Sequence, residues 1–224
     1  MRFSVKSDGN WRAFRHRNYR ILYPANAASN IGGWVQRLAQ DWLVLELTNS
    51  GFYLGIVTAL QFAPVWFFSL PGGALADRFN KRKVLIVTNI AAGLTSLTLG
   101  ILVVTNNVQI WHVMALAFAL GVADAIDKPV RQSFTSEMVG VVDVPNAVSL
   151  NSANFNFGRL VGPALSGLMI AAFGTGPSFL INAFTYVLVI IVMANIREGE
   201  LFREPRAAGP TTIREGFRYV MARP

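Results

Sequence analysis

Six long apolar runs, each close to the length that crosses a lipid bilayer, constrain this chain more than any other feature. A bilayer core requires about 18 to 25 consecutive apolar residues in a helix. Runs of that kind alternate with short polar stretches along most of the chain. The sequence therefore predicts an all-α membrane protein with six transmembrane helices, within Ile21–Leu47, Phe52–Ala76, Val84–Thr105, Ile110–Ile126, Val148–Phe173 and Pro177–Ile196.

The composition agrees with burial in a membrane and excludes several chemistries. Charged residues make up 14% of the chain, against roughly 25% in a typical soluble domain. The absence of Cys excludes disulfide frameworks, thiol catalysis and thiolate metal sites. The two His residues leave no His-based metal motif. We therefore expect no metal, no cofactor and no enzymatic activity.

Basic residues occur in alternate loops, and this pattern predicts an orientation. Cytoplasmic loops of membrane proteins are rich in Lys and Arg. Of the 20 basic residues, 18 lie in the N-terminal arm, the loops after the second and fourth runs, or the C-terminal tail. We therefore expect a multi-pass cell-membrane protein with both termini in the cytoplasm, and no nucleic-acid partner. Its parts are a basic, aromatic arm (1–20), a six-helix bundle (21–196) and a cytoplasmic segment (197–224).

A polar stripe follows one face of the first predicted span. Charged groups in a bilayer core cost roughly 2.5–3.5 kcal/mol each and are functional candidates by default. Arg37 and Asp41, which both belong to this stripe, are four positions apart and can pair. A proton or substrate site and a structural ion pair that lines a cavity both explain this pattern. The stripe consists of Asn26, Asn30, Gly33, Arg37 and Asp41.

The fourth predicted span ends in two acid–base pairs. Asp124 precedes Lys128 by four residues, and Asp127 precedes Arg131 by four, which is the favoured order on a helix. Pro129 predicts a kink or a helix end at this point. The pairs suit an ion-paired helix end. Asp124, the deeper acid, is also a candidate for protonation.

The fifth predicted span combines small residues with one buried charge. Gly158, Gly162 and Ser166 have the small-xxx-small spacing that lets a second helix approach closely. Arg159 in the same span needs an acidic partner, and the acids of the first and fourth spans are the candidates. The predicted cavity set is therefore Asn26, Asn30, Arg37, Asp41, Asp124 and Arg159.

Several motifs resemble signatures of the major facilitator superfamily. Gly73–Lys83, GALADRFNKRK, resembles the cytoplasmic loop signature between the second and third helices. Gly158–Gly167, GRLVGPALSG, is similar to the signature of the drug/proton antiporter branch. Asp41–Thr48 and Pro129–Gln132 further resemble the branch of siderophore exporters and macrolide-efflux-type proteins. The resemblance covers almost all of the chain but only half of the family's twelve-span fold.

The resemblance implies the N-terminal half of a secondary transporter, built of 3+3 inverted repeats, in which two halves rock about a midplane site. It implies a cytoplasmic gate at the loop motif, where Asn80 replaces a usual Gly, and a Gly-Pro stripe packed against the other half. The partners implied are lipid, a small-molecule substrate, protons and a C-terminal six-helix half. The gate residues are Gly73, Asp77, Arg78, Lys81, Arg82 and Lys83, and the antiporter-type residues are Gly158, Gly162, Pro163 and Gly167.

The function implied is proton-coupled efflux of small amphipathic molecules, such as drugs or siderophores, by alternating access. An Arg that many members carry in the fourth helix is Ala117 here, so coupling would use Asp41, Asp124 or Arg159. The sequence has no GxxxxGK[ST] nucleotide loop. A six-span membrane subunit of an ATP-driven transporter is the main alternative, and an inactive half-transporter fragment is the other.

We predict that Asp77→Asn leaves membrane insertion intact but abolishes efflux, because the neutral amide cannot pair with the basic residues of the gate motif. Efflux from cells and the amount of inserted protein are measured in parallel. Normal efflux by correctly inserted Asp77→Asn would remove the gate assignment.

Overall fold

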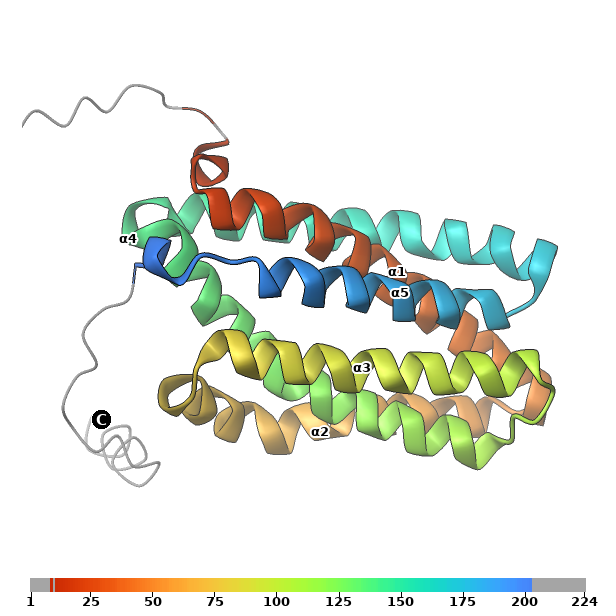
Figure 1. Cartoon of the computed structure of the whole chain (residues 1–224). Helices are drawn as coiled ribbons and strands as arrows, with labels where there is room; N and C mark the ends of the chain where they lie inside the picture. The colour runs from red at the N-terminus through yellow and green to blue at the C-terminus, as the bar shows by residue number, and fades with distance from the viewer. Residues whose placement is uncertain (1–8, 10, 203–224) are drawn as a thin grey trace, which may run out of the picture.

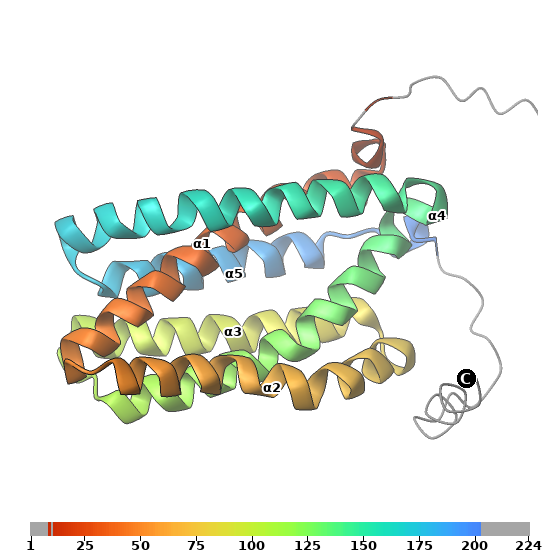
Figure 2. The same cartoon turned by 180° about the vertical axis from the view of Figure 1, so that it is seen from behind.

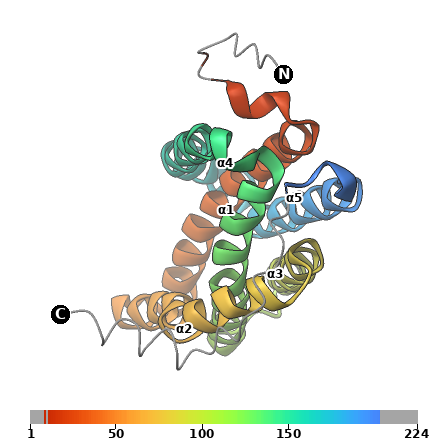
Figure 3. The ribbon, with the colours of Figure 1, turned by 90° about the vertical axis from the view of Figure 1, so that its left-hand side faces the viewer.

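The structure, a computed structural model, describes residues 9 and 11–202, except for the side chains of residues 69–78. Every regular element in this part of the chain is helical (Figures 1 and 2). The long helices are α1 (Arg17–Thr48), α2 (Gly51–Arg78), α3 (Lys81–Val104), α4 (Ile110–Phe173) and α5 (Gly176–Ala194). Two short 3₁₀ helices flank them, η1 (Arg12–Arg15) and η2 (Glu198–Glu200). In the end-on view, α1 and the green part of α4 cross the middle of the bundle, with α2 and α3 below them and the teal part of α4 at the upper left edge (Figure 3).

The main difference from the sequence prediction lies in α4, which contains both the fourth and the fifth predicted spans. Its backbone is helical on both sides of Gly140, which has φ 71° and ψ 160°. Glycine adopts a positive φ without steric cost because it has no Cβ. The chain reverses at this residue, so the second arm of α4 runs back along the bundle (Figure 1). The gap between the fourth and fifth predicted spans implied a long loop around residues 127–147. That prediction is wrong, because the helix continues through Pro129.

The prediction of six separate spans holds only in part. Among the described residues, four helices are long and apolar enough to cross a membrane, namely α2, α3, α4 and α5. The polar stripe lowers the hydropathy of α1, although its 32 residues exceed the length of a span. The 64 residues of α4 are enough for two crossings, since one crossing needs about 20.

Small residues on the second arm of α4 let α1 approach closely. A Cβ on Gly158 would collide with the side chain of Asn30, and one on Gly162 would collide with that of Trp34. The buried hydroxyl of Ser166 donates to a backbone carbonyl of α1 over 2.9 Å. The face with Gly158, Gly162 and Ser166 therefore packs on α1, whereas a Cβ on Gly167 would have nothing within 4 Å. The reversal at Gly140 places this face of α4 beside α1.

The N-terminal arm is attached by charge to the turn in α4. Asp143, which lies between the two predicted spans and outside both, has a side chain that is only 7% exposed. Its carboxylate lies 2.8 Å from His16 Nε2 and 3.4 Å from Arg15 Nη2. Burial raises the pKa of this carboxyl, but the hydrogen bond with His16 and the charges of Arg15 and Arg12 outweigh burial, and the pKa is lowered. The ionised Asp143 therefore fixes η1 at this end, which we call the arm end of the bundle.

We predict that Gly162→Ala destabilises the protein by about 1–3 kcal/mol, because the new methyl group displaces Trp34 and with it α1. Thermal unfolding in detergent is the measurement. Gly167→Ala is the matched control, since a Cβ at that position has nothing within 4 Å. Alanine also gains up to about 1 kcal/mol in a helix over glycine. Equal effects of the two substitutions would contradict the assigned packing face.

Candidate functional site

A cavity of about 870 Å³, lined by both polar and apolar groups, lies between the long helices. Small-molecule sites commonly measure about 300–1,000 Å³, so the cavity has room for a compact organic molecule. Its wall combines amides, charged groups and aromatic rings from all five long helices. Residues of the predicted set and of the predicted helix-end pair lie on this wall, namely Asn26, Asn30, Arg37, Asp124, Asp127 and Arg131.

The structure does not bring the whole predicted set together. Asp41 and Arg159 are absent from the cavity wall, and Arg159 is exposed on α4. Within the part of the chain that the structure describes, neither residue forms an ion pair, so Arg159 lacks the acidic partner expected for it. The expected Arg37–Asp41 pair is also absent, because the guanidinium of Arg37 lies 4.8 Å from the ring centre of Trp34 and 5.0 Å from that of Phe62.

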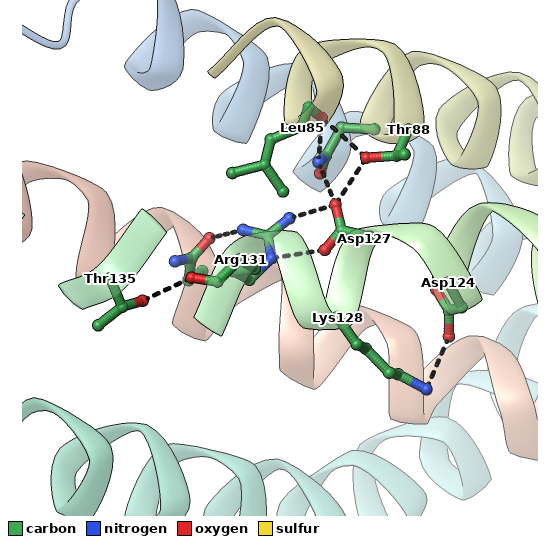
Figure 4. A network of polar contacts seen from close by, with 9 residues as sticks. Leu85, Thr88, Asp124, Asp127, Lys128, Arg131 and Thr135 are labelled. Atoms are coloured by element: carbon green, nitrogen blue, oxygen red, sulfur yellow. Dashed lines mark hydrogen bonds and ion pairs between the residues drawn. The ribbon is translucent and has the colours of Figure 1, made fainter. Parts of the chain in front are cut away.

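The strongest polar network of the cavity is centred on Asp127 of α4 (Figure 4). Arg131 donates to its carboxylate through Nε at 2.6 Å and Nη2 at 2.9 Å. From α3, Thr88 donates over 2.7 Å and Asn89 over 3.0 Å. Arg131 also donates to Asn26 of α1 over 2.6 Å. Hydrogen bonds on both partners offset the cost of burying the charges, so this ion pair joins three helices.

A second ion pair on α4 is looser. Lys128 Nζ lies 3.3 Å from Asp124 Oδ2, and these side chains are 57% and 31% exposed (Figure 4). The side chains of Asp127 and Arg131 are only 15% and 26% exposed. Exposed ion pairs contribute little to stability. Of the two acids on the described cavity wall, Asp124 therefore has the ion pair that contributes less to stability.

The sequence analysis missed a buried amide network. The Oε1 atom of Gln36 on α1 accepts hydrogen bonds of 2.7 Å from Ser96 of α3 and from Asn182 of α5. All three side chains are buried, and Gln36 and Asn182 also line the cavity. The available signal was an isolated amide inside an otherwise apolar run, at Asn182 and also at Asn89. Unpaired amides are costly in an apolar interior, so such residues need partners on other helices.

The loop motif lies at the arm end of the bundle, where its basic residues contact α4 and η2. Lys81 Nζ lies 2.6 Å from Glu137 Oε1, and Arg82 Nη1 lies 3.3 Å from Glu198 Oε1. Asn80, which replaces the usual Gly, caps α3 with φ −66°, and its side chain accepts a hydrogen bond from the backbone N–H of Lys83. The side chains of Asp77 and Arg78, and the environment of Gly73, lie outside the described residues.

We predict that Asp127→Asn destabilises the protein by about 1–3 kcal/mol, because it leaves Arg131 partly buried without a counter-charge. Asp124→Asn is the matched control and should cost less than about 1 kcal/mol, since its pair is more exposed. Thermal unfolding in detergent distinguishes the two variants. The double variant Asp127→Asn/Arg131→Gln should recover part of the stability that Asp127→Asn loses, because it removes the unpaired charge of Arg131. Equal losses in the two single variants would contradict the central place of Asp127.

Comparison with known proteins identifies relatives that are transporters. The chain is 27% identical over 163 residues to the Staphyloferrin A transporter of Staphylococcus aureus, covering 72% of this chain and 41% of that protein. It is 28% identical over 216 residues to the Multidrug efflux pump Tap of Mycolicibacterium fortuitum, covering 91% and 52%. The Macrolide efflux protein A of Streptococcus pyogenes is 21% identical over 206 residues, covering 92% and 50%. The chain therefore spans about half the length of these relatives.

A solved structure confirms the fold at the level of one half. The crystal structure of the POT family transporter PepTSo superposes with a TM-score of 0.75 at 16% identity, covering 87% of this chain and 40% of that one. The model of the Transmembrane secretion effector family (MFS_3) matches residues 8–224. The chain therefore belongs to the Transmembrane secretion effector family of major facilitator transporters, which are membrane proteins and not enzymes.

Proposed function

We propose that this chain contributes half of a secondary active transporter that exports small amphipathic molecules in exchange for protons. The observation that carries the proposal is the cavity, because a cavity wall with paired charges and amides inside an apolar bundle suits a transport pathway. The names of the relatives, which include a siderophore transporter and two efflux proteins, support export of organic molecules.

The proposed architecture is six spans arranged as 3+3 inverted repeats, followed by a cytoplasmic segment from residue 197. The break at Gly140 supports it by dividing α4 into two arms of spanning length. We place both termini in the cytoplasm because the basic residues gather in the arm, in two alternate loops and in the tail. A second six-helix half would complete the cavity, and alternating access would follow from rocking of the halves.

The ion pairs at the arm end support a gate there. Lys81 and Arg82 tie the start of α3 to Glu137 and Glu198. Both contacts lie within this half, so they hold the loop motif in place on the half when the two halves rock. We propose that the loop motif, held in this position, closes the cytoplasmic side against the other half and that Asp77 and Arg78 belong to the same gate.

We propose Asp124 as the proton-coupling acid of this half. It lies on the cavity wall, unlike Asp41 and Arg159, and its ion pair with Lys128 is partly open to solvent. Protonation of Asp124 would release Lys128 and change the charge of the wall. This role would replace that of the family Arg whose position Ala117 occupies.

The proposal predicts dye transport in vesicles from cells that express the gene containing this chain. Three amphipathic fluorescent dyes, one cationic, one neutral and one anionic, are each tested with an imposed pH gradient and, separately, with ATP plus a protonophore. We expect pH-driven transport of at least one dye, its loss in Asp124→Asn, and retention in Arg20→Gln, which removes an exposed charge outside the cavity. Transport that requires ATP and persists with the protonophore would favour the subunit of an ATP-driven transporter. Absence of transport for all three dyes would support an inactive half.

A further inference from the structure

Arg37 differs from the other two basic residues of the cavity wall. Lys128 pairs with Asp124, and Arg131 is held by Asp127 and Asn26. Among the described residues, Arg37 makes no hydrogen bond and no ion pair, and its Nε atom is buried without an acceptor. On the part of the cavity wall that the structure describes, Arg37 is therefore the cationic side chain whose hydrogen-bond donors are unused.

The surroundings of Arg37 orient the guanidinium, and Asp41, one helical turn away, acts on its charge without forming an ion pair with it. Its central carbon lies 4.8 Å from the ring centre of Trp34 on the same helix and 5.0 Å from that of Phe62 on α2. Aromatic faces attract a guanidinium but supply no hydrogen-bond acceptor in its plane. The planar donors of an Arg fit a carboxylate or a phosphate in a two-point contact. The wall therefore offers an oriented group that suits an anion.

The acids of the cavity are already engaged. The oxygens of Asp127 accept hydrogen bonds from Arg131, Thr88 and Asn89. Asp124 has Lys128 as its partner. A cationic guest would have to displace one of these groups, whereas an anionic guest finds Arg37 unengaged. The charges of the wall therefore favour an anion over a cation.

We propose that Arg37 recognises the anionic group of a small organic acid and that the apolar part of this molecule lies along the rings of Trp34, Phe62 and Phe155. Phe155 stands edge-on to Trp34 with ring centres 5.5 Å apart, and all three rings line the cavity. The inference rests on the proposed function, since it names the substrate class of the same cavity. Arg37 is a specificity-determining residue for charge, and the rings accept the remainder of the molecule.

Binding to the purified full chain in lipid nanodiscs tests this assignment with three probes of one shape and different charge. The probes are 2-naphthoate, 2-naphthylmethanol and 2-naphthylmethylammonium, and calorimetry measures their affinities. We expect the wild type to bind 2-naphthoate at least about tenfold more tightly than the other two. Arg37→Gln should remove this preference while binding of the alcohol changes little, and Arg37→Lys should retain part of it. Arg20→Gln removes the same charge from an exposed site on α1 and should change nothing.

Two results would overturn the inference. One is equal affinity of the wild type for the three probes, and the other is an unchanged preference for 2-naphthoate in a folded Arg37→Gln or Arg37→Lys protein. Thermal unfolding of each variant shows whether it is folded. The vesicle assay separates this inference from the proposed function. Arg37-dependent binding without transport would refute only the transport role, and transport without Arg37-dependent preference would refute only the charge selectivity.

Discussion

The stability of the structure depends on hydrogen-bond and ion-pair partners for the charged and amide groups inside an apolar bundle. An unpaired charge or amide is expensive in an environment without water. The pair of Asp127 and Arg131 meets this demand with hydrogen bonds from α3 and to α1, and Gln36 links α1, α3 and α5 in the same way. These contacts link α1, α3, α4 and α5 around the cavity and supply polar groups to its wall, which suits a transport pathway.

Close helix contacts and a single backbone break determine how that cavity is enclosed. Gly158 and Gly162 admit α1 against the second arm of α4, and Gly121 allows the backbone of α2 to lie against the first arm. The positive φ of Gly140 reverses α4 between these two surfaces. One long helix can therefore contact both α1 and α2. At the same end, Asp143 holds the N-terminal arm, so the ends of the helices and the reversal form one connected region.

Spacing along a helix predicted two ion pairs of the cavity and failed for a third. Asp127 and Arg131 are four residues apart and pair as expected, and so do Asp124 and Lys128. Arg37 and Asp41 have the same separation, but the ring of Phe62 from α2 lies where it attracts the guanidinium of Arg37. Local spacing shows which partners are within reach, and it contains no information on competitors from other helices. The same limit explains why the sequence did not predict that Arg159 is exposed. The direction of its side chain depends on which face of α4 packs against α1.

The sequence by itself determined the class of protein, because the length of apolar runs and the position of Lys and Arg follow from the thickness and charge of a membrane. It also determined the family, through motifs short enough to read directly. Only the tertiary structure decided that Gly140 joins two predicted spans into α4, that the small-residue stripe covers α1, and that Arg37 faces the cavity with no hydrogen bond or ion pair to any residue that the structure describes. Each of these depends on contacts between residues far apart in the chain, which no local pattern contains.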